Sequence, residues 1–503
     1  MVKSLALKKQ LPNHLDILTE LPDDELRWCT VRLQEVIKRS KRLEASVFDI
    51  EEKHAREILR RCKWPIHTIG GENAIATDVF VPGRVKRKYL NPNESEAVGF
   101  LGSSEMLDVN PVPVKWLSRT EPKYEQFKVK EGYVLVSCSG TIGNVAYVSP
   151  TLAGFMISQH AIRIVTDYPG YVYCFLKTQT GKALVSANIY GAVISEIEPE
   201  HFNEVQIPNP PKIIKKQIHD KVMRSYSLRE ESNALLAHAH GLLESSLKMV
   251  PLSTLRPRYL GAGGDFRNYM VRLSQLNARL DASYHLPIVH SIMSRLTGAA
   301  GELTTIGDPR ISSRVILPGR FARVYVKEGQ GTVFFGGKQL YQLDPANKKY
   351  LSLAKHGKRI KRDLTLKENM ILITRSGTIG KVASVPIHWA KWIVNEHIIR
   401  VEPATPEISG FLYVFLTTDY GRELITRFTY GSVVDEIDDH HVSQIPVPLL
   451  KDLSVQKQIN RLALEANAKR AEAYYIEQEA IELTNSTVIH ASKDGKTTYP
   501  IKS

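Results

Sequence analysis

Four short stretches of the chain hold residue types that do chemistry in enzymes. Asn209-Pro210-Pro211 begins like the loop that holds a flipped-out base for methylation of its amino group, but Lys212 stands where that loop needs an aromatic ring. No glycine-rich cofactor loop lies upstream, so we predict a strand-to-helix corner instead. Pro22-Asp23 with Glu51 and Lys53 fits a loose nuclease pattern. Such a site needs a metal-binding sheet beneath it, and this stretch is predicted to be helical, so we interpret the match as chance.

The other two stretches suit metal or phosphate binding by composition alone. Asp438-Asp439-His440-His441 contains residue types that bind metals. Its counterpart Glu198-Pro199-Glu200-His201 favours another interpretation, in which both stretches place acidic residues at the start of a helix, where the helix dipole stabilises them. Residues 331–338 approach a phosphate-binding loop but miss its glycine spacing and its Ser or Thr after the lysine. The sequence therefore predicts no catalytic residue and no metal site in this chain.

One glycine-rich pentapeptide occurs twice. Ser139-Gly140-Thr141-Ile142-Gly143 returns 237 positions later as Ser376-Gly377-Thr378-Ile379-Gly380. Each copy follows an apolar run and precedes an alternating stretch, which predicts strand, turn and strand. Two roles remain open for it: a structural turn in which the glycines adopt positive φ, or a group of amides and hydroxyls that grips a phosphate.

Other motifs repeat in the same order, so the chain is predicted to contain one domain twice. Pro82–Tyr89 matches Pro318–Tyr325, and Gln159-His160 matches Glu396-His397. The two histidines lie between apolar residues on predicted strands, which favours core histidines. The further matched pairs are Arg42–Ser46 with Arg279–Ser283, Phe100–Gly102 with Phe334–Gly336, Arg163 with Arg400, Tyr190-Gly191 with Tyr430-Gly431, and Glu196-Ile197 with Glu436-Ile437.

Basic residues gather in both copies. The net charge is +14 and the isoelectric point about 9.3, which suits a polyanionic partner. Residues 348–362 hold seven Lys or Arg and no acid, and such groups neutralise phosphates without reading bases. We therefore predict nucleic-acid binding. The candidate DNA-contacting residues are Arg84, Lys86, Arg87, Lys88, Tyr89, Ser139, Thr141, Arg320, Arg323, Tyr325, Lys348, Lys349, Lys355, Lys358, Arg359, Lys361, Arg362, Arg375, Ser376 and Thr378.

Each copy is followed by a long helical stretch with apolar residues at heptad-like spacing. This spacing predicts two helices that pack along a coiled-coil seam, and some 35 residues span roughly 50 Å at 1.5 Å per residue. The alternative is that each helix only covers its own domain. The predicted packing residues are Leu228, Leu235, Leu242, Ile459, Leu462, Ile476 and Leu483.

These elements divide the chain into segments. We predict a polar helical arm at the N-terminus, two globular domains of mixed helix and sheet, a spacer helix after each, a connector between them, and a loose tail. In chain order the segments are 1–40 (arm), 41–211 (first domain), 212–250 (first helix), 251–278 (connector), 279–450 (second domain), 451–488 (second helix) and 489–503 (tail).

The cysteine spacing and the hydropathy indicate in which cellular compartment the protein is expected. The four cysteines (Cys29, Cys62, Cys138 and Cys174) have no C-x2-C spacing, and Arg375 replaces Cys138 in the second copy. Zinc ribbons and disulfide frameworks are therefore poor interpretations. No uninterrupted apolar run is long enough for a membrane helix or a signal peptide, so a cytoplasmic protein with reduced thiols is expected.

The ordered, duplicated motifs over about residues 40–490 resemble the specificity (S) subunits of type I restriction-modification systems. The resemblance implies an α/β (α+β) fold with two target recognition domains, each binding one half of a bipartite double-stranded DNA site. The two long helices would form an antiparallel coiled-coil spacer. Base-reading side chains vary with the target in this family, so none can be carried over.

The resemblance also implies the partners. Two modification subunits would methylate adenine with S-adenosylmethionine, and restriction subunits would use ATP and magnesium, so this chain would hold no cofactor. The N-terminal arm is longer than expected, which leaves open the specificity subunit of another restriction or phage-defence system. A self-contained nuclease or methyltransferase with a degenerate site, and an interaction scaffold, are the alternatives from other classes.

Overall fold

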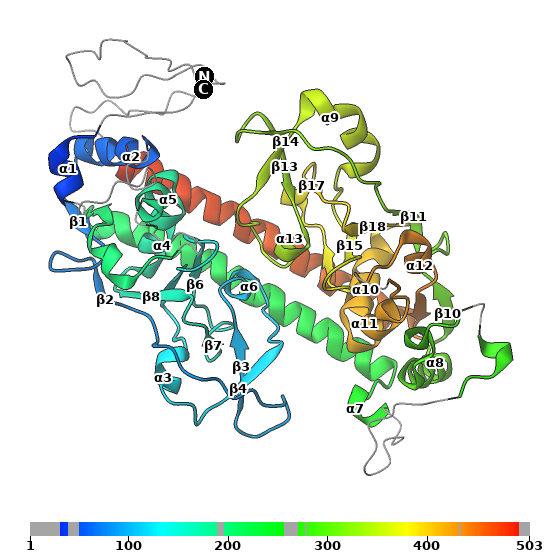
Figure 1. The fold of residues 1–503 in the computed structure, drawn as a ribbon. Helices are drawn as coiled ribbons and strands as arrows, with labels where there is room; N and C mark the ends of the chain where they lie inside the picture. The colour runs from blue at the N-terminus through cyan, green and yellow to red at the C-terminus, as the bar shows by residue number, and fades with distance from the viewer. Residues whose placement is uncertain are drawn as a thin grey trace, which may run out of the picture.

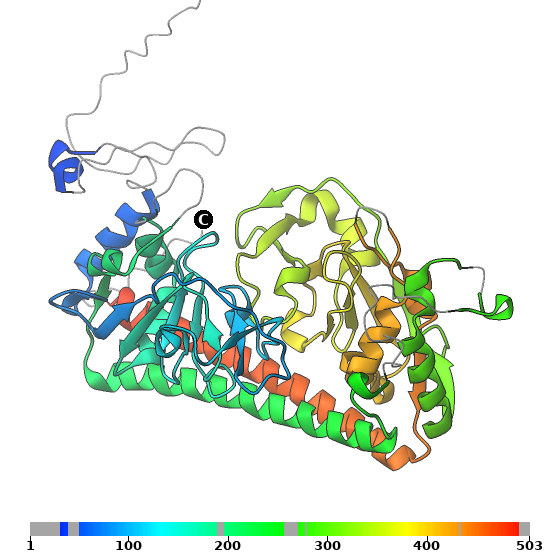
Figure 2. The same ribbon diagram turned by 60° about the horizontal axis from the view of Figure 1, so that its bottom comes forward.

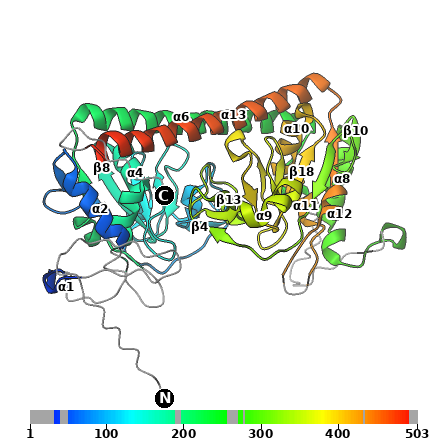
Figure 3. The same ribbon diagram turned by 90° about the horizontal axis from the view of Figure 1, so that it is seen from above.

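In a computed structural model of the chain (Figure 1), two globular domains lie on one side of a pair of long helices, as Figure 3 shows. The structure describes residues 31–38, 50–187, 189, 196–255, 270–276, 279–431 and 434–491. None of the helices within these ranges is both long and apolar enough to cross a membrane.

The first domain is built on a four-stranded antiparallel sheet and a three-stranded sheet that contains one parallel pair. The four strands, in sheet order, are β2 (Ala76–Phe80), β8 (Ala161–Thr166), β5 (Val134–Ser137) and β6 (Val145–Tyr147). The three strands are β4 (Lys115–Ser118), β3 (Ala97–Leu101) and β7 (Met156–Ile157), with β3 parallel to β7. The other elements are α2 (Ile50–Arg61), β1 (Ile66–Thr68), η2 (Glu105–Leu107), α3 (Tyr124–Phe127), α4 (Pro169–Lys177), α5 (Gln179–Ser186), η3 (Pro199–Asn203) and β9 (Gln206–Pro208), which pairs with β1.

The second domain repeats this plan and adds one short strand to its second sheet. Its antiparallel sheet has the order β11 (Ser312–Ile316), β18 (Ile398–Pro403), β15 (Ile371–Thr374) and β16 (Val382–Ser384). Its other sheet has the order β12 (Tyr325–Val326), β14 (Lys349–Ser352), β13 (Gly331–Phe335) and β17 (Ile393–Val394), again with one parallel pair. The other elements are α8 (Pro287–Ala299), β10 (Glu302–Thr305), α9 (Leu353–Arg359), η7 (Ile360–Leu364), α10 (Pro406–Thr417), α11 (Asp419–Thr426), α12 (Asp439–Ser443) and β19 (Pro446–Leu449). The predicted duplication and mixed fold are confirmed.

The apolar runs before the pentapeptides become the central strands of the two cores. All four residues of β5 and of β15 are buried, because each strand is covered on both faces. One face of β5 packs on the cluster that contains α4, and the other packs toward the second sheet of the domain. A continuous apolar run is the expected pattern for such a strand.

The two long helices lie side by side and run in opposite directions (Figures 1 and 2). They are α6 (Lys212–Ser246) and α13 (Leu453–Thr484). Each begins in its own domain and ends in the core of the other: Leu243 near the end of α6 packs in the second domain's core, and Ala480 near the end of α13 packs in the first domain's core. The predicted pair of long antiparallel helices is confirmed, and the alternative that each covers only its own domain is wrong.

The contact row on α6 differs from the predicted leucine row. Ser225 Oγ donates a hydrogen bond of 2.7 Å to the carbonyl oxygen of Ala473, so small residues let the two backbones approach closely. Leu228 is fully buried, but Leu235 and Leu242 are half-buried against the second domain's core. The buried row of α6, at steps of four and three residues, is Ile218, Val222, Ser225, Arg229, Ser232, Leu236, Ala239 and Leu243.

On α13 the predicted residues divide in the same way. Ile459 and Leu462 are buried, whereas Ile476 and Leu483 are half-buried. The buried residues of α13 are Ile459, Asn460, Leu462, Ala463, Ala466, Asn467, Ala471, Ala473, Glu477, Ala480 and Thr484. Leu228 clusters with Ala473 of α13 and Leu343 of the second domain, whereas Leu483 packs against the first domain's core, because heptad spacing alone does not say which neighbour a helix face meets.

One carboxylate ties α13 to the first domain and to α6. Glu477 is fully buried and forms ion pairs with Lys177 of α4 and Arg229 of α6, and it accepts a hydrogen bond of 3.0 Å from Tyr173 Oη. Burial alone would raise the pKa of Glu477, but Lys177 and Arg229 lower it to about 2. The carboxylate therefore stays charged between two cations.

The segment limits at the two termini differ from the prediction. Of the predicted arm, 1–40, only residues 31–38 are described, and they contain α1 (Leu33–Lys38). The predicted tail, 489–503, begins too early, because Ile489 is buried in the first domain's core and the carbonyl of Ala491 accepts a hydrogen bond of 2.8 Å from Lys63 N. Residues 492–503 lie outside the described ranges, as do 256–269 and 277–278 of the connector.

Replacing Glu477 by Gln is expected to lower the free energy of unfolding by about 3–5 kcal/mol, because two buried cations lose their counter-charge. Urea denaturation followed by circular dichroism measures this. The matched control is Glu479→Gln on the same helix, whose exposed carboxylate pairs with Lys221 at 2.7 Å. The control is expected to unfold close to the wild type, and equal destabilisation of both variants would contradict the assignment.

The same carboxylate predicts acid sensitivity. The pKa of Glu477 is lowered in the folded chain from 4.5 to about 2, so its contribution to stability is complete above about pH 4.5 and is lost as the pH falls toward 2. Urea midpoints measured across this window should fall more steeply for the wild type than for Glu477→Gln. Parallel curves would show that Glu477 does not carry this dependence.

Candidate nucleic-acid interface

The pentapeptides form the turns that join β5 to β6 and β15 to β16. The φ angles of Gly140 and Gly143 are +74° and +82°, and those of Gly377 and Gly380 are +72° and +82°. A β-carbon at Gly140 or Gly377 would meet no atom within 4 Å, so the positive φ alone requires glycine there.

A hydroxyl at the end of the first strand closes each turn. In the first domain, Ser137 Oγ donates to the carbonyl oxygen of Thr141 at 2.6 Å and accepts from Asn144 N at 2.9 Å. In the second domain, Thr374 Oγ1 makes the same pair of bonds, at 2.6 and 2.9 Å, with Thr378 and Lys381. This geometry supports the structural role, while the exposed Thr141 and Thr378 face solvent at the tip of each turn.

Beside the turn, the second domain carries a network of arginines and glutamates. Arg375 forms an ion pair with Glu436 and donates from Nε to the carbonyl oxygen of Ile437 at 3.1 Å. The exposed Arg320 reaches the same Glu436 at 3.8 Å. Arg323 pairs with the buried Glu396. Arg320, Arg323 and Arg375 were each predicted DNA-contacting residues, and the structure brings them together on one face.

The first domain has the same network with less charge. Arg84 lies 4.0 Å from Glu196, and Arg87 donates to the amide oxygen of Gln159, which replaces Glu396. Cys138 replaces Arg375, and its pKa is raised to about 11, mainly by burial, so the thiol is neutral. We did not predict Glu196 and Glu436 as site residues. Their repetition at matched positions in the two copies was the sequence signal that could have identified them.

The two histidines that we expected in the core lie instead on this face. His160 and His397 are in turns that precede β8 and β18, and both are partly exposed. Ser376 Oγ and His397 Nδ1 are hydrogen-bonded at 2.7 Å, so the second residue of the matched pair reaches the pentapeptide turn. The prediction of core histidines is wrong because the chain turns one residue before each strand begins.

Tyr89 and Tyr325 present half-exposed rings next to lysines. The Nζ atom of Lys115 lies 5.5 Å from the centre of the Tyr89 ring, and that of Lys349 lies 4.9 Å from the centre of the Tyr325 ring. Lys86 and Lys88 are exposed on the segment that leads to Tyr89. An exposed ring with cations around it suits contact with a sugar-phosphate backbone and its bases.

The basic run 348–362 divides into protein-facing and solvent-facing side chains. Lys348 pairs with Asp344, and Arg359 donates to the carbonyl oxygen of Gly319 at 2.5 Å and lies 4.6 Å from the centre of the Phe321 ring. Arg362 pairs with its neighbour Asp363 at 2.7 Å. The side chains of Lys349, Lys355, Lys358 and Lys361 are exposed, and Lys349 lies over the Tyr325 ring. DNA contact by the run stays a prediction, and these four lysines face solvent.

The enzyme-like motifs take structural roles. Asn209 lies at the corner between β9 and α6, where its Oδ1 accepts from Lys215 Nζ at 2.8 Å. Asp438 caps α12 by accepting from His441 N at 2.9 Å, and residues 331–335 form β13. Within the described ranges no group of three potential ligands could hold a metal ion. Pro22-Asp23 lies outside these ranges.

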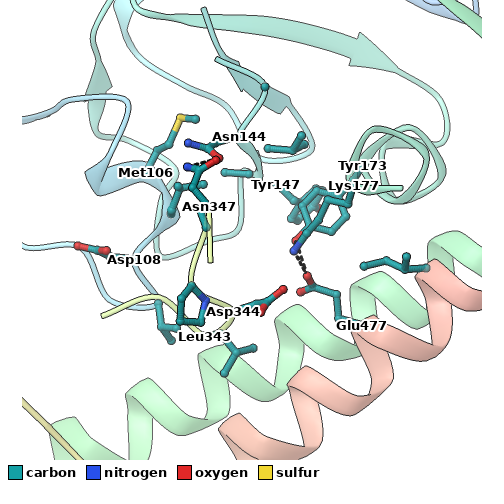
Figure 4. Close-up of a pocket in the computed structure, with 18 of the residues that line it drawn as sticks. Met106, Asp108, Asn144, Tyr147, Tyr173, Lys177, Leu343, Asp344, Asn347 and Glu477 are labelled. Atoms are coloured by element: carbon teal, nitrogen blue, oxygen red, sulfur yellow. Dashed lines mark hydrogen bonds and ion pairs between the residues drawn. The ribbon is translucent and has the colours of Figure 1, made fainter. Parts of the chain in front are cut away.

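A cavity of about 550 Å³ lies where both domains meet both helices (Figure 4). Tyr147 and Lys177 line it from the first domain, Asp344 and Asn347 from the second, and Glu477 from α13. Asn347 Nδ2 donates to Asn144 Oδ1 across it at 3.2 Å. The wall mixes both signs of charge, so the cavity marks the junction of the four parts and differs in character from the basic outer surface.

These features define a class: a protein in which one domain occurs twice and an antiparallel helix pair holds the copies together. The family model for the type I restriction modification DNA specificity domain matches residues 77–234 and 326–462. The chain therefore belongs to this family, with two copies of its domain. The family is that of the specificity subunit, which is non-catalytic.

Three solved structures are similar to the chain. The S subunit of a type I restriction-modification system from M. genitalium is 14% identical, with 84% of this chain and 93% of that chain covered and a TM-score of 0.31. The HsdS subunit from Thermoanaerobacter tengcongensis is 14% identical, with 82% and 95% covered and a TM-score of 0.26. A chain from a structure on complex assembly and conformational transition of the type I R-M system is 14% identical, with 83% and 96% covered and a TM-score of 0.26. No curated protein matches the chain.

Replacing Lys355, Lys358 and Lys361 together by Ala is expected to weaken DNA binding by the assembled complex without changing the preferred sequence. The logarithmic slope of affinity against salt should become shallower by about 0.9 for each phosphate that a lysine no longer neutralises. The matched control replaces Lys212, Lys216 and Lys221 on α6 by Ala, which removes the same charge from the helix pair. Equal weakening in both variants would show that net charge, and not this surface, accounts for the effect.

Proposed function

We propose that this chain is the DNA-reading subunit of a type I restriction-modification complex, in which each domain binds one half of a bipartite double-stranded target. The observation that carries the proposal is the exchange of helix ends: α6 and α13 each start in one domain and finish in the core of the other. The two domains are thereby related by an approximate twofold arrangement. A protein of this symmetry matches a target whose two halves lie at a set distance along the groove.

The helix pair serves as the spacer between the half-sites. Its members have 35 and 32 residues, which corresponds to about 50 Å at 1.5 Å per residue. This length exceeds one turn of B-DNA, about 34–36 Å, so two half-sites separated by a gap come within reach of the two domains.

Binding by two linked domains also explains why an intact site would be preferred. Once one domain is bound, the other meets its half-site at a high effective concentration, so modest affinities multiply. The faces that carry Arg84 and Arg320 would supply phosphate contacts, which position the domains and carry no sequence information.

The chemistry would come from other subunits. Two modification subunits would methylate adenine with S-adenosylmethionine, and restriction subunits would use ATP and magnesium. This chain would supply no catalytic group and would act in the cytoplasm, where the DNA is. The support for this division is the family membership and the structural roles of the enzyme-like motifs.

A footprint of the assembled complex on its target tests the proposal. We expect two protected segments separated by a less protected gap, because each domain covers one half-site. The purified chain incubated alone with DNA and S-adenosylmethionine, or with DNA and magnesium, is expected to show no turnover. One continuous footprint independent of sequence would contradict bipartite binding, and turnover by the chain alone would favour an enzyme.

A further inference from the structure

The two domains touch each other directly, beside the helix pair. A loop after η2 in the first domain reaches the second domain, where Val109 N donates a hydrogen bond of 2.9 Å to the carbonyl oxygen of Tyr341. Asp108 and Gln342 form an antiparallel β-bridge at the same place. We call these four residues, Asp108, Val109, Tyr341 and Gln342, the interdomain bridge.

The first-domain side of the bridge is fastened to the helix pair. Asn233 of α6 donates from Nδ2 to the carbonyl oxygen of Val109 at 3.1 Å and to Thr151 Oγ1 at 3.3 Å. Val109 also packs at the edge of a small apolar cluster that contains Leu343 of the second domain and Ala473 of α13. The loop therefore contacts the second domain and both long helices.

The second-domain side is equally constrained. The carbonyl oxygen of Leu343, next to the bridge, accepts bonds from His388 Nε2 at 2.9 Å and Trp389 Nε1 at 3.1 Å. Gln342 is buried, and its Oε1 accepts from Ala346 N at 2.8 Å. Backbone held at this many points does not move independently of its domain, so force on the bridge acts on the whole domain.

The carboxyl of Asp108 lies at the bridge, where its surroundings raise its pKa. Burial raises the pKa of Asp108 to about 7, while Lys381 of the second domain opposes the rise and Glu105 adds to it. The Nζ atom of Lys381 lies 5.0 Å from the centre of the Tyr341 ring, so this second-domain charge lies next to the bridge.

We propose that the interdomain bridge is a specificity-determining element that fixes the distance and the rotation between the two domains. This inference rests on the proposed function. Both helices are packed into both cores, so relative motion of the domains requires the helix pair to bend or twist between them. A direct contact between the domains resists this motion, so the half-site gap is set by the bridge together with the helices.

The geometry of DNA makes both quantities matter. One added base pair moves a half-site by about 3.4 Å, and at about 10 base pairs per turn it also rotates the half-site by roughly 35°. A pair of domains locked at two places cannot follow both changes. A pair joined only by the helices can follow a half-site that is one base pair out of place by bending or twisting the helix pair.

The test replaces Val109 by Pro, which removes the N–H that donates to Tyr341. Asp108 has φ −72° and ψ 141°, the extended conformation that a residue before proline adopts, so the loop itself can accept the change. The matched control is Val112→Pro in the same loop, where the side chain is 63% exposed between two prolines. A second variant combines Asn233→Ala with Asn347→Ala and introduces no proline. It removes the hydrogen bond from α6 to Val109 and the hydrogen bond between Asn347 and Asn144 of the other domain.

The readout is the set of genomic sites methylated by the assembled complex in cells, together with the thermal melting of each complex. The wild type and Val112→Pro are expected to methylate sites with one gap length. In Val109→Pro and in the double variant, preference for this gap over gaps one base pair longer or shorter is expected to fall about tenfold, with both half-site sequences unchanged.

The two proposals fail in different ways. If folded Val109→Pro and the folded double variant select the gap as strictly as the wild type, the helices alone set it and the bridge inference is overturned. If the wild-type complex itself methylates no bipartite motif, the proposed function is overturned whatever the variants do.

Discussion

The close antiparallel packing of α6 on α13 is the constraint on which the rest of the structure depends. Ser225 meets the backbone of Ala473 at the seam, so the helices approach through small side chains while their longer ones enter the domains. Because each helix ends in the opposite core, neither domain can be completed without the other's helix. The distance between the domains is thus part of the folding of both.

The duplicated scaffold is symmetric, but its charges are not. His219 and Asn460 both accept from the N–H of a glycine, Gly170 and Gly410, near the start of the two helices, so equivalent residues are 241 positions apart. By this count Leu236 stands where α13 has Glu477. Likewise Cys138 stands opposite Arg375 and Gln159 opposite Glu396. The two halves of one repeated frame therefore carry different charges at equivalent positions.

Repetition of a residue in both copies does not by itself indicate a role in binding. Arg163 and Arg400 are fully buried, and each donates to backbone carbonyls at the junction of its domain's two sheets, including those of Ile157 and Val394 at 2.6 Å. Burial lowers the pKa of Arg163 to about 10 and that of Arg400 to about 9. These guanidiniums hold the scaffold, whereas Arg84 and Arg320 at other repeated positions remain exposed.

The sequence by itself determined the duplication, the strands on either side of each glycine turn and the two long helices. These follow from repeated motifs, from local patterns of apolar residues, and from glycines at positions that require positive φ. Only the tertiary structure decided which basic side chains face solvent, since Lys348 pairs with Asp344 and Arg359 donates to the backbone carbonyl of Gly319, which is 40 positions away in the sequence. It also decided the seam, where Ser225 bonds to the backbone of the partner helix, and the contact of Val109 with Tyr341. Such choices depend on what lies opposite a residue, and a single sequence records only what lies beside it.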